Sequence, residues 1–406
     1  MSNANQRTHR RPEDGELEFI RRLRRALHRR PELGHHEHRT SLHVERLLRL
    51  MGLRPFRPAP TSIAVLIGTG DERPRIAFRA DLDAVPVHEA TGAGYASRNP
   101  GAMHACGHDG HTAALLALAR RLTTYPVHTG PVLLLFQQAE ETFPSGAPIL
   151  IKGLPPHLTP DEIFAFHLWP ELPANTVGVT SGTLMGSVAG LTFDVLGRAS
   201  TPSGTTAGMD GADAVAAAVQ LYCRLAPGTG RTLSNDSGSA LSLGVINGGE
   251  GPNRVAEHCR IEGTLRATSW RTQEQAAESI FATAKSVEAE TGTTINAAIR
   301  SGIRPPVENS TGSARRIEEA CSHLGIECRS YPSEPVGVSE DFGWYLERWN
   351  GAMFLLGCGR DQDHPSLHAP DFDFDEAVLL NAVDIFYDLA VQRSARDAAS
   401  VASVSL

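Results

Sequence analysis

Apolar residues along the chain form short, nearly continuous runs that alternate with amphipathic segments. Residues 16–30 place apolar side chains at helical spacing and arginines on the opposite face, which predicts a surface helix. Runs rich in Val, Ile, Leu and Phe predict strands buried on both faces, at residues 62–68, 75–80, 131–136 and 161–166. A helix is predicted between two of these strands, at 108–124. This alternation is typical of an α/β fold with a largely parallel sheet.

The pattern changes near residue 187. A strand, a helix, two strands, a helix and a strand are predicted in this order, at 191–197, 211–225, 241–246, 260–267, 271–291 and 294–300. The order βαββαβ is that of a ferredoxin-like unit. The α/β pattern resumes after Pro305-Pro306, with elements predicted at 313–324, 353–357 and 376–393. We therefore expect a discontinuous first domain, 1–186 and 302–406, interrupted by an inserted domain at 187–301.

Composition narrows the class of protein. A length of 406 residues fits two domains, and 41% hydrophobic with 21% charged residues is typical of a globular chain. No run of about 18 apolar residues predicts a membrane span. A net charge of −8 argues against a nucleic-acid partner. The six cysteines are scattered without the spacing of a disulfide scaffold, and no apolar signal-peptide core follows the polar N-terminus, so we expect a cytoplasmic protein.

Side chains that can bind metals gather just after the predicted strands. In parallel α/β sheets, ligands bind outside the carboxyl ends of the strands. Four clusters lie at such places, at 81–86, 103–111, 137–141 and 167–170. A fifth lies far downstream, at 366–370. Together they offer thiolate, imidazole and carboxylate, the ligand types suited to Zn²⁺, Mn²⁺, Co²⁺ or Ni²⁺. The sequence thus predicts a metal site at this edge of the sheet.

Two pairs of residues suggest how such a site would work. Cys106 and His108 are two positions apart on a turn and can bind the same ion or adjacent ions. Of Glu140 and Glu141, one can bind a metal while the other accepts a proton from water activated by the metal. Taken alone, a Cys-x-His pair is more often structural and a Glu-Glu pair is usually solvated. Their convergence with the other clusters favours the catalytic interpretation.

Other motifs are excluded or set aside. No Gly-x-Gly-x-x-Gly follows a strand and no Gly-x-Ser-x-Gly occurs, which argues against a dinucleotide-dependent oxidoreductase and a serine hydrolase. His35, His36 and His38 match neither His-Glu-x-x-His nor His-x-x-Glu-His, because Thr40 stands where the second His is needed. We interpret these three histidines as surface residues.

The ordered series of motifs resembles the M20 metallopeptidase family, and in particular its D subfamily of aminoacylase-like amidohydrolases. The motifs are Asp81-x-Asp83-Ala-x-Pro86, Met103-His-Ala-Cys-Gly-His-Asp-Gly-His-Thr112, Ala139-Glu-Glu141, Phe166-His-Leu-Trp-Pro170, Ser339-Glu-Asp-Phe342 and Leu367-His368. The resemblance extends from Pro31-Glu-Leu-Gly34 to Phe372-x-Phe374. It implies a zinc-peptidase-like catalytic domain with an inserted lid, and a metal-dependent hydrolase of small N-acyl amino acids or related conjugates.

The resemblance also implies roles for individual residues. One or two divalent ions (Zn, Mn, Co or Ni) would be held by Cys106, His108, Glu141, His167 and His368. Glu140 would be the general base, which also protonates the leaving amine, and Asp83 would support catalysis by orienting a ligand or Glu140. Asp81 stands where other subfamilies have a metal-binding His, so we expect it only behind the ligands.

The inserted domain is expected to act as a lid and to carry the contacts of a homodimer. Asn253 and Arg266 fall on lid positions that bind substrate in the D subfamily. The family motif Gly-x-Gly-Gly-His reads Gly197-Arg-Ala-Ser-Thr201 here, so Thr201 replaces a His that stabilises the transition state. A neighbouring residue could compensate, the substrate could be a biosynthetic intermediate, or the enzyme could be weakened. A metallodipeptidase and a metal- or ligand-binding protein without activity are the other hypotheses.

Overall fold

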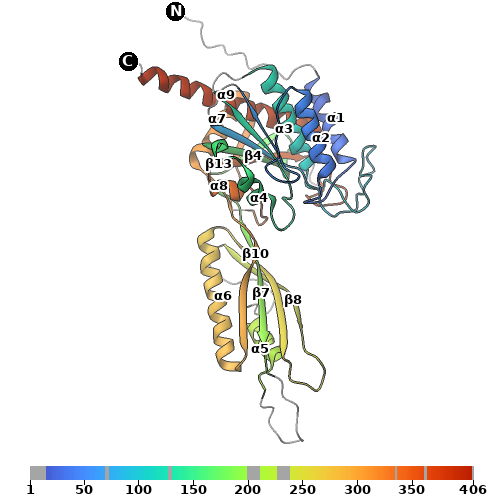
Figure 1. The fold of residues 1–406 in the computed structure, drawn as a ribbon, viewed down its shortest axis with the longest axis vertical. Coiled ribbons are helices and arrows are strands. Elements are labelled where there is room, and N and C mark those ends of the chain that lie inside the picture. Colours follow the sequence, from blue (N-terminus) through green and yellow to red (C-terminus); the bar gives the residue numbers. More distant parts are fainter. Residues whose placement is uncertain are drawn as a thin grey trace, which may run out of the picture. The chain divides into compact units, whose positions relative to one another are not determined.

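The computed structural model of the chain describes residues 15–68, 73–126, 130–198, 211–225, 238–333, 336–360 and 364–404 (Figure 1). The chain divides into two compact units. Unit 1 comprises Met1–Leu184, Glu308–Glu334 and Asp341–Leu406, and unit 2 comprises Met185–Val307 and Pro335–Glu340. The chain therefore leaves unit 1 twice, once for the long insertion and once for the short segment 335–340.

Unit 1 is built on a mixed sheet of seven strands within the described residues. In spatial order these are β1 (Ile63–Ile67), β3 (Val132–Gln137), β2 (Ile76–Asp81), β4 (Glu162–Pro173), β13 (Asn350–Gly359), β5 (Thr176–Val179) and β12 (Glu327–Ser330). The pairs β2–β3, β2–β4, β4–β13 and β5–β12 are parallel, whereas β1–β3 and β5–β13 are antiparallel. The expectation of an α/β fold with a largely parallel sheet is confirmed.

Helices cover this sheet on both faces. The main core lies between the strands and the helices α1 (Glu16–His28), α2 (His38–Leu50), α3 (His108–Thr124), α7 (Thr311–Leu324) and α9 (Leu379–Val404). Side chains alternate between the two faces of a strand, so Phe78 on β2 points into this core, 4.6 Å from the ring of Phe386 on α9. Arg79 and Asp81 therefore point to the opposite face, where α4 (Gly146–Gly153) and α8 (Gly343–Leu346) lie in contact.

β4, α2 and α9 are among the elements that differ from the sequence prediction. β4 continues to Pro173, so His167 lies within a strand and not after its end. The reason is that β13 pairs with β4 as far as Trp169 and beyond, which supplies hydrogen-bond partners past the apolar run. Helix α2, which is absent from the prediction, follows the segment around His36. Helix α9 extends to Val404, beyond the predicted end at residue 393.

Unit 2 contains a four-stranded antiparallel sheet within the described residues, in the spatial order β10, β7, β9, β8. The chain order is β7 (Ser187–Leu196), α5 (Ala214–Leu225), β8 (Ser239–Gly248), β9 (His258–Ala267), α6 (Trp270–Thr291) and β10 (Thr294–Arg304). Both helices pack against the sheet around a core that includes Phe193, Ile261 and Ile280 (Figure 1). The predicted βαββαβ order is confirmed. Two short strands, β6 (Gly182–Met185) and β11 (Val307–Asn309), pair separately.

In the described part of the chain, no helix combines the length and the apolar character needed to cross a membrane.

A buried charge cluster joins α1 to the first turn of α3. Asp109 accepts hydrogen bonds from Arg24 Nε at 2.9 Å and from His28 Nδ1 at 2.7 Å, and Arg24 also pairs with Asp373. On its other side the His28 ring faces Glu89, 3.3 Å from Nε2. Burial by itself lowers the pKa of His28, but the charges of Asp109 and Glu89 outweigh it and raise that pKa to about 9. The folded protein therefore holds His28 in its charged form.

This cluster predicts a pH dependence of stability. Because the pKa of His28 is near 6.5 in the unfolded chain, its stabilising contribution is complete below pH 6.5 and disappears as the pH rises through about 9. The loss should be on the order of 3 kcal/mol in the free energy of unfolding. Neighbouring His104 acts in another window. Burial lowers its pKa to about 3, so the fold keeps this ring neutral, and stability falls as the pH drops below about 6.5, where the unfolded chain binds the proton. Tyr95, which also faces the His28 ring, has its pKa raised and titrates above this range.

Urea unfolding of the wild type and of His28→Gln at pH 6.5 and 9.5 measures the effect. The wild type should lose more stability than the variant between the two pH values. An equal loss in both proteins would contradict the assignment of this titration to His28.

Candidate metal centre

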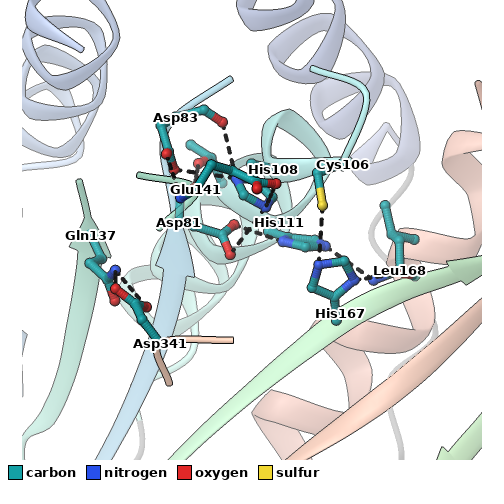
Figure 2. Close-up of polar contacts among 12 residues, drawn as sticks. Asp81, Asp83, Cys106, His108, His111, Gln137, Glu141, His167, Leu168 and Asp341 are labelled. Carbon is teal, nitrogen blue, oxygen red and sulfur yellow. Dashed lines mark hydrogen bonds and ion pairs between the residues drawn. The ribbon is translucent and has the colours of Figure 1, made fainter. Parts of the chain in front are cut away.

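Two of the predicted ligands lie at the start of α3. Gly107 precedes the helix with a φ of 84°, in the left-handed region that favours glycine. A Cβ at this position would lie 2.7 Å from Cδ1 of Leu168, so the turn packs directly against β4. This tight turn places the buried side chains of Cys106 and His108 on the same side of the site (Figure 2).

Hydrogen bonds to the backbone orient two imidazole rings. His108 Nδ1 lies 3.0 Å from the carbonyl oxygen of Asp83, and His167 Nδ1 lies 2.8 Å from that of Leu168. A carbonyl only accepts, so each Nδ1 carries the hydrogen, and Nε2 is the nitrogen that can bind a metal once it is unprotonated. His167 Nε2 points to Cys106 Sγ at 3.5 Å. His108 Nε2 is buried without a hydrogen-bond partner among the described residues.

Glu141 and His368 complete the predicted set. His368 Nε2 lies 2.9 Å from Glu141 Oε1, which is itself 3.9 Å from His108 Nε2. The N–H of His368 donates to the carbonyl of Ala105 at 2.9 Å, which docks the distant segment around His368 on the turn before Cys106. The N–H of Glu141 donates to Asp83 Oδ2 at 2.9 Å. Asp83 thus contacts His108 through its backbone and Glu141 through its side chain.

The structure brings all five predicted ligands and Glu140 into overlapping groups. Within each group the candidate ligand atoms lie within 4.8 Å of one another, and the groups are Cys106 with His108 and His167, Cys106 with Glu141 and His368, and His108 with Glu140 and Glu141. Cys106 belongs to two of these groups and His108 to two. The donor atoms are a thiol sulfur, imidazole nitrogens and carboxylate oxygens, which is a set that fits divalent transition metals.

The electrostatics of the site fit a cation. Burial raises the pKa of the Cys106 thiol well above its usual range, and the negative charge of Glu141 raises it further. Burial also favours the neutral form of Glu141, but His368 and His108 outweigh it and hold that pKa at about 2. A bound divalent ion favours the thiolate over the thiol. A bound cation would also satisfy the buried Nε2 of His108, which has no hydrogen-bond partner among the described residues.

Asp81 and His111 lie directly behind the ligands. His111 Nδ1 contacts Asp81 Oδ1 at 2.7 Å, and His111 Nε2 accepts the N–H of Leu168 at 3.1 Å (Figure 2). Both nitrogens of His111 are therefore engaged by the protein. Asp81 Oδ2 lies 3.7 Å from His108 Nε2. Burial disfavours the charged form of Asp81, yet His108, His111 and Arg79 hold its pKa well below the usual range.

A second buried network supports Asp81 from the other side. Arg79 Nη1 donates to Asp81 at 2.7 Å, and Arg79 Nη2 donates to Asp341 at 2.8 Å. Gln137 Nε2 donates to both carboxylate oxygens of Asp341, at 2.9 and 2.8 Å (Figure 2). The side-chain oxygen of Gln137 accepts from Arg79 Nε at 2.8 Å. Neither Arg79 nor His111 was assigned a role from the sequence. Arg79 could have been noticed, since it precedes Asp81 by two residues and a buried strand seldom carries an unpaired arginine.

The predicted lid residues lie in unit 2. Asn253 is exposed in the turn between β8 and β9. Arg266 is exposed on β9 and donates to the carbonyl of Gly337 at 2.9 Å. Thr201 lies outside the described residues.

The three histidines of the segment 35–38 differ in exposure. His36 and His38 are exposed, as predicted. His35 is half-buried, and its Nε2 contacts the carbonyl oxygen of Pro144 at 2.8 Å. The pattern of histidines gave no sign of this contact, because it joins two loops that are far apart in the sequence.

Comparison with known proteins places the chain in context. The family model described as Peptidase family M20/M25/M40 matches residues 77–392. The chain is 32% identical to an N-acetyl-L-cysteine deacetylase of Bacillus subtilis over 91% of its own length and 86% of that protein. It is 34% identical to an N-acetyldiaminopimelate deacetylase of Bacillus velezensis, over 91% of its own length and 97% of that protein.

Among solved structures, the fold is similar to that of the YXEP protein of Bacillus subtilis, described as a dinuclear metal binding peptidase from the M20 family. The TM-score is 0.79 at 27% identity, with 94% of this chain and 99% of that chain covered.

Proposed function

The chain belongs to peptidase family M20/M25/M40, and from this membership we propose that it hydrolyses the amide bond of small N-acyl amino acids. Membership confirms the resemblance to M20 enzymes and the expectation of a metal-dependent amide hydrolase. The observation that carries the proposal is the gathering of Cys106, His108, Glu141, His167 and His368 beside Glu140. The assignment to the D subfamily stays a prediction.

We assign two ion positions that share Cys106. One would use Cys106 with His108 and His167, and the other Cys106 with Glu141 and His368. When bound, a divalent ion polarises an amide carbonyl and lowers the pKa of water toward neutrality. Asp83 holds His108 by its carbonyl oxygen and Glu141 by its carboxylate, so it keeps one ligand of each position in place.

Glu140 is the group we assign to proton transfer. Its side chain is buried next to His108 and Glu141. It would accept the proton of the attacking water and deliver it to the leaving amine nitrogen, so that the amine departs uncharged and the carboxylate is regenerated. The adjacent Glu141 is less suited to this task when it binds a metal, because the cation withdraws charge from its oxygens and makes them weaker proton acceptors.

The substrate class follows from the relatives. The two deacetylases named above release an acyl group from an amino-acid nitrogen, and we propose the same bond here. Asn253 and Arg266, both exposed in unit 2, are the residues we assign to the substrate carboxylate or the oxyanion. We propose that Thr201 occupies the position of the family's lid histidine.

A substrate screen tests the proposal. N-acetyl, N-benzoyl and indoleacyl amino acids and a set of dipeptides are incubated with the protein and added Mn²⁺, Zn²⁺, Co²⁺ or Ni²⁺, and amine release is measured. We expect metal-dependent release from one or more N-acyl amino acids. Release from dipeptides alone would favour a metallodipeptidase. Bound metal without release from any amide would favour a ligand-binding protein or a lid impaired at Thr201.

We also propose a cytoplasmic homodimer that associates through unit 2. Within the described residues all six cysteines are free, as suits a reducing compartment. Strand β8 is an edge strand whose Val245 and Ile246 are about half exposed, which suits association with a second copy. Light scattering should give about twice the chain mass of 43.6 kDa. Val245→Lys should reduce that value to one chain mass, and an unchanged mass would place the contact elsewhere.

A further inference from the structure

Residues 34–37 contact the loop that carries Glu140 and Glu141. A Cβ on Gly34 would lie 1.9 Å from Cγ2 of Thr142 and 3.3 Å from Cα of Ala139, so no larger residue fits without displacing the loop. His35 holds the far end of the same loop through the carbonyl of Pro144. The two segments are about a hundred positions apart in the chain and pack directly against each other.

Glu37 supplies the central contact between these segments. Its side chain is buried, and its Oε1 accepts hydrogen bonds from the N–H of Ala139 at 2.7 Å and of His35 at 3.0 Å. Its Oε2 accepts the hydroxyl of Thr61 at 2.7 Å. Among the described residues, no arginine or lysine forms an ion pair with it. The carboxyl group is thus buried at a cost in stability, and its main partners are backbone N–H groups.

Ala139 is strained, and Glu37 holds it. Ala139 has a φ of 50°, a left-handed conformation that is costly for a residue with a Cβ. Its N–H is bound by Glu37, and its carbonyl oxygen accepts the N–H of Gly146 at 2.9 Å. Strained residues of this kind persist only where their surroundings restrain them. The direction in which the chain leaves Ala139 decides where Glu140 and Glu141 point.

Two carboxylates therefore bracket Glu140. Glu37 binds the N–H of Ala139, just before it, and Asp83 binds the N–H of Glu141, just after it. The side chain between these two anchors is the proposed general base. We propose that Glu37 is a positioning residue, which acts through the N–H of Ala139 to set the direction of Glu140 and of the ligand Glu141. This inference rests on the proposed function, since Glu140 and Glu141 take their roles from it.

Three substitutions of Glu37 distinguish the effect of side-chain length from the effect of charge. Glu37→Gln keeps the length of the side chain and an oxygen acceptor but removes the charge. Glu37→Asp keeps the charge but is one methylene shorter, so its oxygens cannot reach the Ala139 N–H with the same geometry. Glu37→Ala removes both. If Glu37→Ala does not fold, Glu37→Gln and Glu37→Asp still test the proposal.

The affinity for Co²⁺ alone, measured by titration of the metal-free protein, is the first readout. Glu37→Asp and Glu37→Ala should bind Co²⁺ about 10–100-fold more weakly than wild type, as is usual when a partner behind a ligand is lost. Glu37→Gln should stay within about threefold, because its amide oxygen still accepts the Ala139 N–H. Backbone hydrogen exchange of a peptide spanning residues 138–146 should accelerate in Glu37→Asp and Glu37→Ala only.

The matched control is Glu162→Ala. Glu162 is a buried carboxylate at the start of β4 that binds Ser313 and Arg316 on α7. Its loss should lower stability and leave Co²⁺ affinity and the exchange of that peptide unchanged. Wild-type affinity and exchange in Glu37→Asp and Glu37→Ala would overturn the inference. A wild type that binds Co²⁺ but hydrolyses no amide would overturn the proposed function, while the Co²⁺ and exchange data would still test Glu37.

Discussion

Glu140→Gln is expected to lower kcat by about 10²–10⁴-fold, the usual contribution of a general acid–base group. Glutamine has nearly the same shape as glutamate, so the fold and the packing around the site should be kept. Its amide cannot accept the proton of the attacking water, because its oxygen is far less basic and its nitrogen carries two hydrogens. The deficit should therefore lie in turnover, with metal content unchanged.

The neighbouring position provides the control. Glu141→Gln changes the next residue by the same single group, yet Glu141 lies among the proposed ligands with Cys106 and His368. This variant should lose metal affinity first and activity as a consequence, and excess metal should restore part of its turnover. Excess metal should not help Glu140→Gln. Full hydrolysis by Glu140→Gln, measured as amine release under saturating substrate, would remove Glu140 from the role of base.

Cys106→Ala is expected to have the second large effect, the loss of bound metal. Cys106 belongs to both proposed ion positions, so its removal should affect every ion that the site holds. The affinity should fall by at least the 10–100-fold that loss of a residue behind a ligand costs, because a ligand itself is removed. Elemental analysis after reconstitution with Zn²⁺ or Mn²⁺ and gel filtration measures the remaining content.

A second buried thiol serves as the control for Cys106. Cys358 on β13 is also buried, and it belongs to none of the metal-binding groups found among the described residues. Cys358→Ala should bind as much metal as wild type, with at most a loss of stability from the cavity that it creates. Equal metal content in Cys106→Ala and wild type would refute the assignment of the thiol.

The state of the Cys106 thiol adds a second check. Burial raises the pKa of Cys106, so without a cation the sulfur is protonated at neutral pH. A metal must displace this proton to bind the sulfur, and metal binding should release it to the buffer. Calorimetric titrations in buffers with different ionisation enthalpies would therefore report proton release in the wild type and less in Cys106→Ala.

The clusters that contain the candidate ligands could be predicted from the sequence because their residue types match metal chemistry, and the resemblance to the M20 family then identified the individual ligands. Cys106 and His108 are neighbours in the chain, and so are Glu140 and Glu141, so local spacing already links them. The fold class could be predicted for a similar reason, since buried strands and amphipathic helices have different periods. The extent of β4 could not be predicted, because that strand continues past His167 through its pairing with β13 and not through its local composition.

The positions of Glu37, Arg79 and His111 depend on contacts over long distances in the sequence. Glu37 reads as one polar residue among histidines, and only the folded chain brings it to the N–H of Ala139. His111 looks like a further ligand in its motif, but Asp81 and the N–H of Leu168 occupy both of its nitrogens. Arg79 interrupts an apolar strand, and its partners Asp341 and Gln137 come from segments 262 and 58 residues away.

The sequence by itself determined the class of the fold, the order of the elements and the set of residues able to bind a metal, because these follow from local periodicity and from side-chain chemistry. Only the tertiary structure decided which nitrogen of each histidine faces the site, which carboxylates hold backbone N–H groups, and which strained turn presents Glu140. These features arise where segments distant in the chain meet, and a hydrogen bond between two such segments leaves no mark on the residues beside either one.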